Sequence, residues 1–132
     1  MKSMPRIGSL MTPFPYAVGP DDSLATARRL MAEHRIRHLP LMVEGRPAGV
    51  ITDQDMRRAV AAGGDETAIR IGDLTPTEAC EADITAPLDL VLSQMAARQL
   101  DSALVLKADK LVGIFTSTDA CRRFADESRD GP

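Results

Sequence analysis

Residues 49–58 read GVITDQDMRR, and residues 113–122 read GIFTSTDACR. Each segment opens on Gly, carries Thr and Asp at matching positions, and has Arg in the tenth position. The two glycines lie at an offset of 64, and the same offset aligns identical residues far outside the motif. These further pairs are Ile7 and Ile71, Gly8 and Gly72, Leu10 and Leu74, Leu24 and Leu88, Met31 and Met95, and Ala32 and Ala96. A fixed internal offset of this kind indicates a tandem duplication of one structural unit.

The two copies show the same order of predicted elements. In the first copy, Asp22 or Ser23 caps a helix with apolar residues at helical spacing, and two apolar runs flank the turn at 44–47. A second helix follows Thr52 and stops at a pair of glycines. The second copy repeats this order, and Pro87 opens its first helix.

The same pattern predicts the fold class and the boundaries of the copies. Short extended segments at 16–18 and 80–82 precede the first helix of each copy, which makes each unit β-α-β-β-α. We expect an α+β fold in which the two units pack sheet against sheet, because one unit alone cannot bury both its helices and its sheet. The first repeat spans 7–62, a linker spans 63–70, and the second repeat spans 71–126.

Composition narrows the class of partner. The chain has 132 residues, of which 44% are hydrophobic and 27% charged, and its formal net charge is −3. This balance is typical of a compact globular domain and provides no overall basic field for nucleic acid or an anionic membrane. The two cysteines lack metal-ligand spacing, so no metal site is predicted. No apolar run reaches membrane-spanning length, and we expect a cytoplasmic protein.

The recurring Thr and Asp suggest a ligand site. Thr52 and Thr116 end predicted strands, and Asp55 and Asp119 fall in the first turn of the following helices. A carboxylate can accept hydrogen bonds from the two hydroxyls of a ribose, while a Thr hydroxyl and helix amides suit sugar or phosphate oxygens. The alternative is that these residues only cap their helices. The motif persists where its neighbours differ between the copies, which favours a nucleotide ligand.

Residues 7–126 as a whole resemble a tandem pair of CBS domains, often called a Bateman module. The segments that carry the resemblance are IGSLMT, IGDLT, VGPDDSLATARRLM, RIRHLPLMVEGRPAGVITDQDMRRA and LVGIFTSTDACRR. The resemblance implies two clefts between the CBS motifs that bind an adenosyl compound: AMP, ADP, ATP or S-adenosylmethionine. It also implies a regulatory module without catalytic activity and a pair that dimerises.

The resemblance also assigns site residues. Thr52, Asp55, Thr116 and Asp119 match the family's Thr and ribose-binding Asp, and Val18 lies on a strand whose residues flank adenine. Arg37 and His38 stand where basic residues face phosphates, but the second repeat has Asp101 and Ser102 there. Phosphate charge would then fall to Arg37 and His38 and to Arg57, Arg58, Arg122 and Arg123, which favours ligands with few phosphates.

Two functions remain open at this stage. One is a ligand-sensing regulatory module that signals to an effector protein, and the other is a dimerising scaffold with empty clefts. No nucleophile motif or phosphate loop indicates an enzyme, and no catalytic residue is assigned. We expect a homodimer through the apolar helix positions of both repeats. Those positions are Leu24, Ala27, Leu30, Met31, Leu88, Val91 and Met95.

Overall fold

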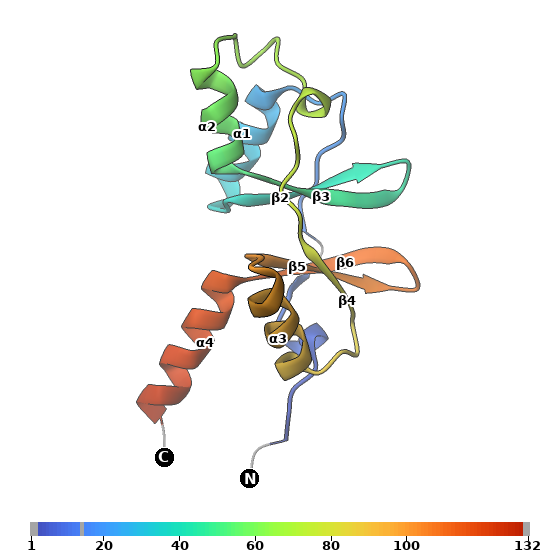
Figure 1. Ribbon diagram of the computed structural model, residues 1–132, viewed down its shortest axis with the longest axis vertical. Helices are drawn as coiled ribbons and strands as arrows, with labels where there is room; N and C mark the ends of the chain where they lie inside the picture. The colour runs from blue at the N-terminus through green and yellow to red at the C-terminus, as the bar shows by residue number, and fades with distance from the viewer. Residues whose placement is uncertain (1–2, 14, 131–132) are drawn as a thin grey trace. The chain divides into compact units, whose positions relative to one another are not determined.

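The computed structural model describes residues 3–13 and 15–130, and the chain divides into two compact units (Figure 1). One comprises residues 15–78 and is called here the Asp55 unit. The other, the Asp119 unit, comprises residues 79–130 together with the described N-terminal residues 3–13. The units therefore differ in extent from the sequence repeats, since the segment that opens each repeat packs in the unit formed by the rest of the other repeat.

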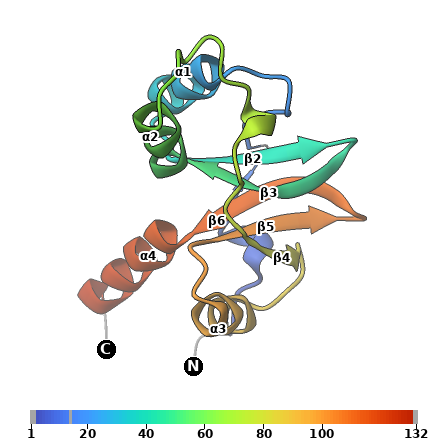
Figure 2. The ribbon, with the colours of Figure 1, turned by 45° about the horizontal axis from the view of Figure 1, so that its top comes forward.

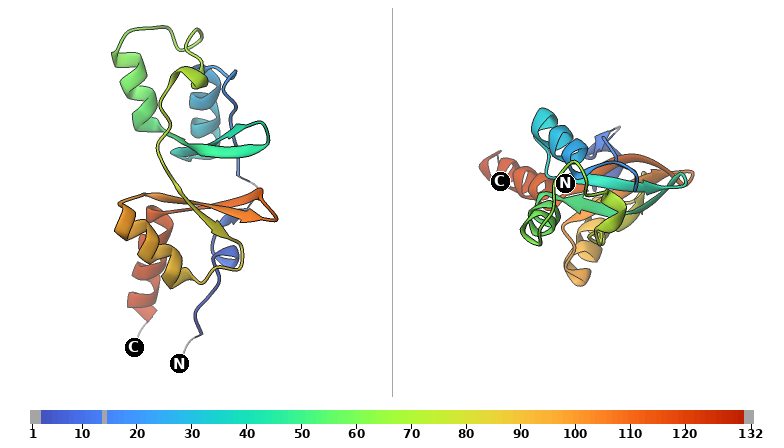
Figure 3. Two further views of the ribbon diagram at one scale, coloured as in Figure 1. Left: turned by 45° about the vertical axis from the view of Figure 1, so that its right-hand side comes forward. Right: turned by 90° about the horizontal axis from the view of Figure 1, so that it is seen from above.

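The elements confirm the α+β class and follow the predicted order with two differences: the segment expected to be extended at 16–18 contributes only an isolated bridge at Val18, and a short strand that was not expected forms at 12–13. The helices are α1 (Leu24–His34), α2 (Asp53–Ala61), α3 (Leu88–Arg98) and α4 (Ser117–Asp130). The strands are β1 (Thr12–Pro13), β2 (His38–Val43), β3 (Arg46–Thr52), β4 (Cys80–Asp83), β5 (Ser102–Lys107) and β6 (Lys110–Thr116). Short 3-10 helices occupy Ile7–Ser9 and Ile71–Asp73. In each unit the helices lie on one face of the strands (Figures 2 and 3).

The two units share one strand topology. In the Asp119 unit the sheet order is β1-β6-β5-β4, with β5 antiparallel to β6 and parallel to β4. In the Asp55 unit β2 and β3 form the matching antiparallel hairpin. Val18 forms a parallel bridge with Leu41, as β4 does with β5 in the other unit. Thr77 forms an antiparallel bridge with Val50, as β1 does with β6. The duplication seen in the sequence is thus also a duplication of topology.

The start of α1 illustrates how local sequence sets the elements. The sequence left Asp22 and Ser23 as alternative caps, and the structure selects Ser23, whose hydroxyl accepts a 3.1 Å hydrogen bond from the Thr26 amide. Asp22 instead accepts a hydrogen bond from the Gly19 amide in the preceding turn. This cap satisfies one of the amides that the first turn of a helix leaves without a partner.

Each unit has its own aliphatic core, and this corrects one expectation. The apolar helix positions expected to form a dimer interface are instead packed within the units: Leu24, Ala27 and Met31 are buried in the Asp55 unit, and Leu88, Val91 and Met95 in the Asp119 unit. Leu30 packs against the first of these clusters. The expected interface is therefore wrong, because side chains that fill a core are not available to a second molecule.

The glycines that open the two motifs allow a close crossing of backbones. Gly49 has a φ of +103°, and a Cβ placed there would lie 2.8 Å from the carbonyl oxygen of Thr77. A Cβ on Gly113 would lie 3.0 Å from the carbonyl oxygen of Thr12. Both glycines thus let the segment that opens a repeat lie directly against the second strand of the hairpin.

Candidate functional site

The first motif forms a reciprocal helix cap at the junction of β3 and α2. The hydroxyl Oγ1 of Thr52 accepts a 3.1 Å hydrogen bond from the Asp55 amide, and the Thr52 amide donates a 2.9 Å hydrogen bond to Asp55 Oδ2. This arrangement is a capping box, which holds the Asp side chain at the rim of the sheet. The capping interpretation left open by the sequence therefore applies to Oδ2 of this carboxylate.

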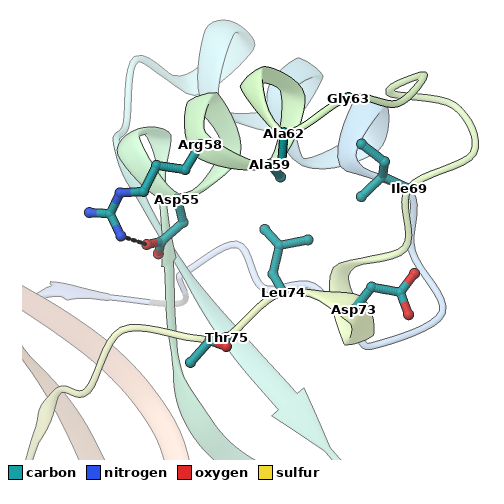
Figure 4. Close-up of a pocket in the computed structure, with 9 residues that line it drawn as sticks. All are labelled: Asp55, Arg58, Ala59, Ala62, Gly63, Ile69, Asp73, Leu74 and Thr75. Atoms are coloured by element: carbon teal, nitrogen blue, oxygen red, sulfur yellow. Dashed lines mark ion pairs between the residues drawn. The ribbon is translucent and has the colours of Figure 1, made fainter.

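Asp55 has a further donor from a distant part of its unit. The hydroxyl of Thr77 donates a 2.9 Å hydrogen bond to the same Oδ2. The Asp55 side chain is only 7% exposed, and its other oxygen, Oδ1, lies 3.9 Å from Nη1 of Arg58. Figure 4 shows this ion pair at one end of a hollow. Both oxygens of the Asp55 carboxylate therefore have partners: Oδ2 accepts hydrogen bonds, and Oδ1 forms the ion pair.

The second motif repeats the cap with a more open carboxylate. Asp119 Oδ2 accepts hydrogen bonds from the Thr116 amide at 2.9 Å and from the Thr116 hydroxyl at 3.0 Å. Its Oδ1 lies 3.7 Å from Nη1 of Arg122, and the side chain is 24% exposed. Asp119 is therefore the more accessible of the two motif carboxylates.

Arg37 and His38 lie at the same rim as the first motif. His38 begins β2 and is paired with Thr52 across the hairpin, and the carbonyl of Arg37 accepts a 3.2 Å hydrogen bond from the Asp53 amide. The Asp119 unit has the same arrangement, in which Ser102 is paired with Thr116 and the Asp101 carbonyl accepts from the Ser117 amide. The structure therefore brings the predicted basic pair to the first motif, and it puts an acidic and a neutral residue at the corresponding rim of the other unit.

The remaining predicted site residues differ in their surroundings. Val18 donates its amide to the Pro40 carbonyl and accepts the Met42 amide, and its side chain is buried in the core of the Asp55 unit. The side chain of Val18 is therefore not accessible to a ligand, and Val18 takes part in the strand pairing through its backbone. Arg58 and Arg122 are largely exposed beyond their ion pairs with the motif carboxylates. These two guanidinium groups are accessible to a ligand that reaches either rim.

A hollow of about 440 Å³ extends from Asp55 along the face of α2. Its lining comprises Asp55, Arg58, Ala59, Ala62, Gly63, Ile69, Asp73, Leu74 and Thr75. In Figure 4, Leu74 and Ala59 face one another in the middle, with Arg58 and Asp55 to one side. The sequence analysis missed most of this lining. The helical spacing of residues 55, 58, 59 and 62 was the available signal for the α2 face.

The Asp119 unit has a corresponding hollow of about 430 Å³ with a different lining. It comprises Leu10, Phe115, Asp119, Arg122, Arg123, Asp126, Glu127 and Asp130. At the offset of 64, Ala59 and Ala62 of the first hollow are replaced by Arg123 and Asp126. Carboxylates outnumber guanidinium groups in both hollows, which disfavours ligands with several phosphate charges.

The carboxyl groups with lowered pKa values lie outside these hollows. The backbone amide of Thr67 donates a hydrogen bond that lowers the pKa of Asp65, and the hydroxyl of Thr85 lowers the pKa of Asp83. Both acids are exposed and accept these bonds within tight local turns. Their pKa shifts therefore reflect turn formation.

Three further features complete the description of the chain. Within residues 3–13 and 15–130, no three side chains of His, Cys, Asp or Glu gather in a way that could hold a metal ion. His34 lies in the last turn of α1, and its ring stacks on Tyr16 at a centroid distance of 3.6 Å. In the described part of the chain, no helix combines the length and apolar character needed to cross a bilayer.

Comparisons with known proteins agree with this architecture. Residues 7–62 match the family model of the CBS domain. The chain is 25% identical to the CBS domain-containing protein YhcV of Bacillus subtilis strain 168 over 126 residues. The aligned region covers 95% of this chain and 90% of YhcV. The duplicated fold and the paired motifs thus define a CBS domain pair.

Solved structures match over almost the whole length. The CBS domain pair of protein MJ0100 in complex with 5'-methylthioadenosine and S-adenosyl-L-methionine is 25% identical, with a TM-score of 0.79 over 94% of this chain and 98% of that one. Hypoxic Response Protein I with two coordinated zinc ions is 29% identical, with a TM-score of 0.76 over 89% of this chain and 98% of that one. The first repeat matches the CBS domain model and the whole chain has the fold of a solved CBS domain pair, which confirms the resemblance found in its sequence.

Proposed function

We propose that the protein is a regulatory module that binds an adenosyl compound at its Thr–Asp rims and signals to an effector protein. The observation that carries this proposal is the paired geometry of the two motif carboxylates. Asp55 and Asp119 each engage Oδ2 in the helix cap and direct Oδ1 toward a largely exposed arginine. An ionised carboxylate oxygen in this setting can accept hydrogen bonds from the vicinal hydroxyls of a ribose.

The choice among adenosyl ligands follows from charge. Two carboxylates and one guanidinium line the Asp55 hollow, and the Asp119 hollow is lined by four carboxylates and two guanidinium groups. A triphosphate would meet net repulsion there, whereas 5'-methylthioadenosine and S-adenosylmethionine carry no phosphate. The MJ0100 complex, a relative with both of these ligands, supports the same preference. We therefore rank S-adenosylmethionine and 5'-methylthioadenosine above AMP, and AMP above ADP and ATP.

The two motifs are unequal in this proposal. Asp119 is the stronger candidate for ribose binding because its side chain is the more exposed of the two. Asp55 has a larger structural role, since its Oδ2 accepts a second hydrogen bond from Thr77 in a distant segment. The protein has no catalytic role in this scheme, and bound ligand is released unchanged.

Absorbance and calorimetry test the proposal directly. With one Tyr and no Trp, the protein absorbs little at 280 nm, so adenine that purifies with it should dominate the spectrum near 260 nm. Titration of ligand-free protein with S-adenosylmethionine, 5'-methylthioadenosine, AMP and ATP should then give saturable binding in the proposed order. Absence of binding for all four compounds would reject the sensor and leave the dimerising scaffold, in which the motif carboxylates only cap helices.

A further inference from the structure

Residues 63–70, called here the strap, lead from the end of α2 to the 3-10 helix at Ile71–Asp73 and form part of the wall of the Asp55 hollow. Gly63 and Ile69 are the strap residues in the lining, and Figure 4 shows both at the end of the hollow away from Asp55. This end of the hollow is therefore complete only while the strap is in place.

The strap also caps the first helix of its unit. The carbonyl of Ile69 accepts a 2.9 Å hydrogen bond from the Leu24 amide, and the carbonyl of Glu66 accepts one of 3.1 Å from the Ala25 amide. The Ser23 hydroxyl is the acceptor for one further amide of this first turn. Because the first amides of a helix have no partner within the helix, the start of α1 depends on the strap for two of its acceptors.

An ion pair between Arg28 and Glu66 adds to these backbone bonds. Nε of Arg28 lies 2.7 Å from Oε1 of Glu66, and the two side chains are 45% and 37% exposed. Within the strap, Glu66 and Ile69 are partly buried and the other residues are exposed. Because so little of the strap is buried, we expect it to undock locally at a lower free energy than the helices beside it.

The strap is built to move as a unit about a pair of glycines. Gly63 and Gly64 have φ angles of +101° and +144°, which glycine adopts without steric cost. Beyond them, the carbonyl of Asp65 accepts hydrogen bonds from the amides of Ala68 and Ile69. The strap is thus a compact turn that is joined to α2 through a glycine hinge.

We propose that the strap is the element of the Asp55 unit that responds to a ligand. A ligand in the hollow favours the docked strap, and an empty hollow allows the strap to undock from α1. This inference rests on the proposed function, since it takes an adenosyl compound as the ligand. Undocking removes Gly63 and Ile69 from the wall, so a ligand that contacts them binds the docked state more tightly and shifts the equilibrium toward it.

The strap begins the segment of chain that leads to the other unit. From the strap the chain continues through Ile71, whose amide donates a 2.9 Å hydrogen bond to the Asp22 carbonyl. It then reaches Thr77, whose hydroxyl is bonded to Asp55, and the Asp119 unit resumes at residue 79. Docking of the strap therefore restrains the start of the connection between the units.

Amide hydrogen exchange of the full chain, measured by NMR, tests the docking. The reporting amides are those of Leu24 and Ala25, which are bonded to the strap. The Leu88 amide is the internal reference, because it donates the equivalent 2.9 Å hydrogen bond to the Pro5 carbonyl in the Asp119 unit. Exchange that changes at the first two amides and not at Leu88 reports the strap and not the stability of the whole chain.

Two substitutions remove the ion pair in the ligand-free protein. Glu66→Gln and Arg28→Gln should each speed exchange at the two reporting amides by about two- to fivefold, the range expected for an exposed ion pair. Arg29→Gln is the matched control, because Arg29 lies on the same helix and pairs with Glu33 within that helix. If Glu66→Gln and Arg28→Gln exchanged no faster than Arg29→Gln, docking of the strap through this pair would be wrong.

Addition of 5'-methylthioadenosine to the wild type tests the response. At about 100 times the dissociation constant found by calorimetry, the ligand should slow exchange at Leu24 and Ala25 by about tenfold or more, and by more than at Leu88. Binding without this added protection would overturn the strap as the responding element and leave the proposed function intact. Absence of binding in calorimetry would reject the proposed function, and the response of the strap with it.

Discussion

The hydroxyl of Thr77 donates a 2.9 Å hydrogen bond to Oδ2 of Asp55, across 22 positions of sequence. In the Asp119 unit, the corresponding oxygen of Asp119 accepts from the hydroxyl of its own neighbour Thr116. Asp55 is thus hydrogen-bonded to a segment distant in the sequence, whereas Asp119 is hydrogen-bonded to a residue of its own motif. The two motif carboxylates therefore differ in their hydrogen-bond partners and in exposure, with side chains 7% and 24% exposed.

Loss of the Thr77 hydroxyl should destabilise the fold. Thr77→Val removes a donor to a nearly buried carboxylate at little change in volume, so the free energy of unfolding should fall by about 1–2 kcal/mol. Thr12→Val is the matched control, because Thr12 makes the equivalent strand pairing in the other unit but is exposed. Urea unfolding measures both. Equal losses for the two variants would contradict a special role for the Thr77 bond.

The two motif carboxylates should respond differently to removal. Asp119→Ala should weaken binding of the adenosyl ligand by about tenfold or more, because a charge-assisted hydrogen bond to ribose is lost. Asp55→Ala should instead act mainly on stability, since its nearly buried carboxylate accepts hydrogen bonds from the Thr52 amide and from the distant Thr77 hydroxyl. Calorimetry gives the affinities, and urea unfolding of each variant gives the stabilities. If Asp55→Ala alone abolished binding, the assignment of the stronger site would be wrong.

Removal of one guanidinium should separate ligands by their phosphate content. Arg122→Gln should weaken binding of AMP by several-fold, on the order of the cost of an exposed ion pair, and should leave 5'-methylthioadenosine unaffected. Arg129→Gln is the control, because Arg129 pairs with Asp126 one turn beyond the motif. The measurement is calorimetry with both ligands. Equal effects of Arg122→Gln on the two ligands would show that Arg122 does not meet the phosphate.

The crossing at Gly49 should be intolerant of a side chain. Gly49→Ala and Gly45→Ala each place a Cβ at positive φ, which costs about 1 kcal/mol. A Cβ on Gly49 also meets the Thr77 carbonyl oxygen at 2.8 Å, whereas nothing lies within 4 Å of one on Gly45. Gly49→Ala should therefore lower the free energy of unfolding by at least about 1 kcal/mol more than Gly45→Ala. Thermal and urea unfolding compare the pair, and similar losses would argue against the close crossing.

Substitution of Ile7, near the N-terminus, should perturb the packing of the C-terminal half of the chain. Ile7 is fully buried in the core of the Asp119 unit, so Ile7→Ala should cost about 2–4 kcal/mol through lost contacts and a cavity. Amide chemical shifts measured by NMR should change most among residues 79–130. Changes concentrated in residues 24–61 would contradict the exchange of the opening segments, in which the start of each repeat packs in the unit formed by the rest of the other repeat.

Much of this architecture was predictable because its determinants are local. The duplication, the hairpins and the helix starts follow from the offset of 64, from turn residues and from caps such as Ser23. The motif Thr and Asp were also located correctly at strand-helix junctions, since a capping box involves residues only three positions apart. The sequence by itself therefore determined the repeated unit and the positions of its chemically important side chains.

Tertiary structure decided what those side chains contact. The exchange of the opening segments depends on pairings such as Thr77 with Val50, and local periodicity contains no signal for pairings between distant residues. The same packing committed the apolar helix faces to the cores and left Phe124 exposed on α4. An apolar stripe shows that a face will be buried, and only the three-dimensional arrangement determines whether the chain itself or another molecule buries it.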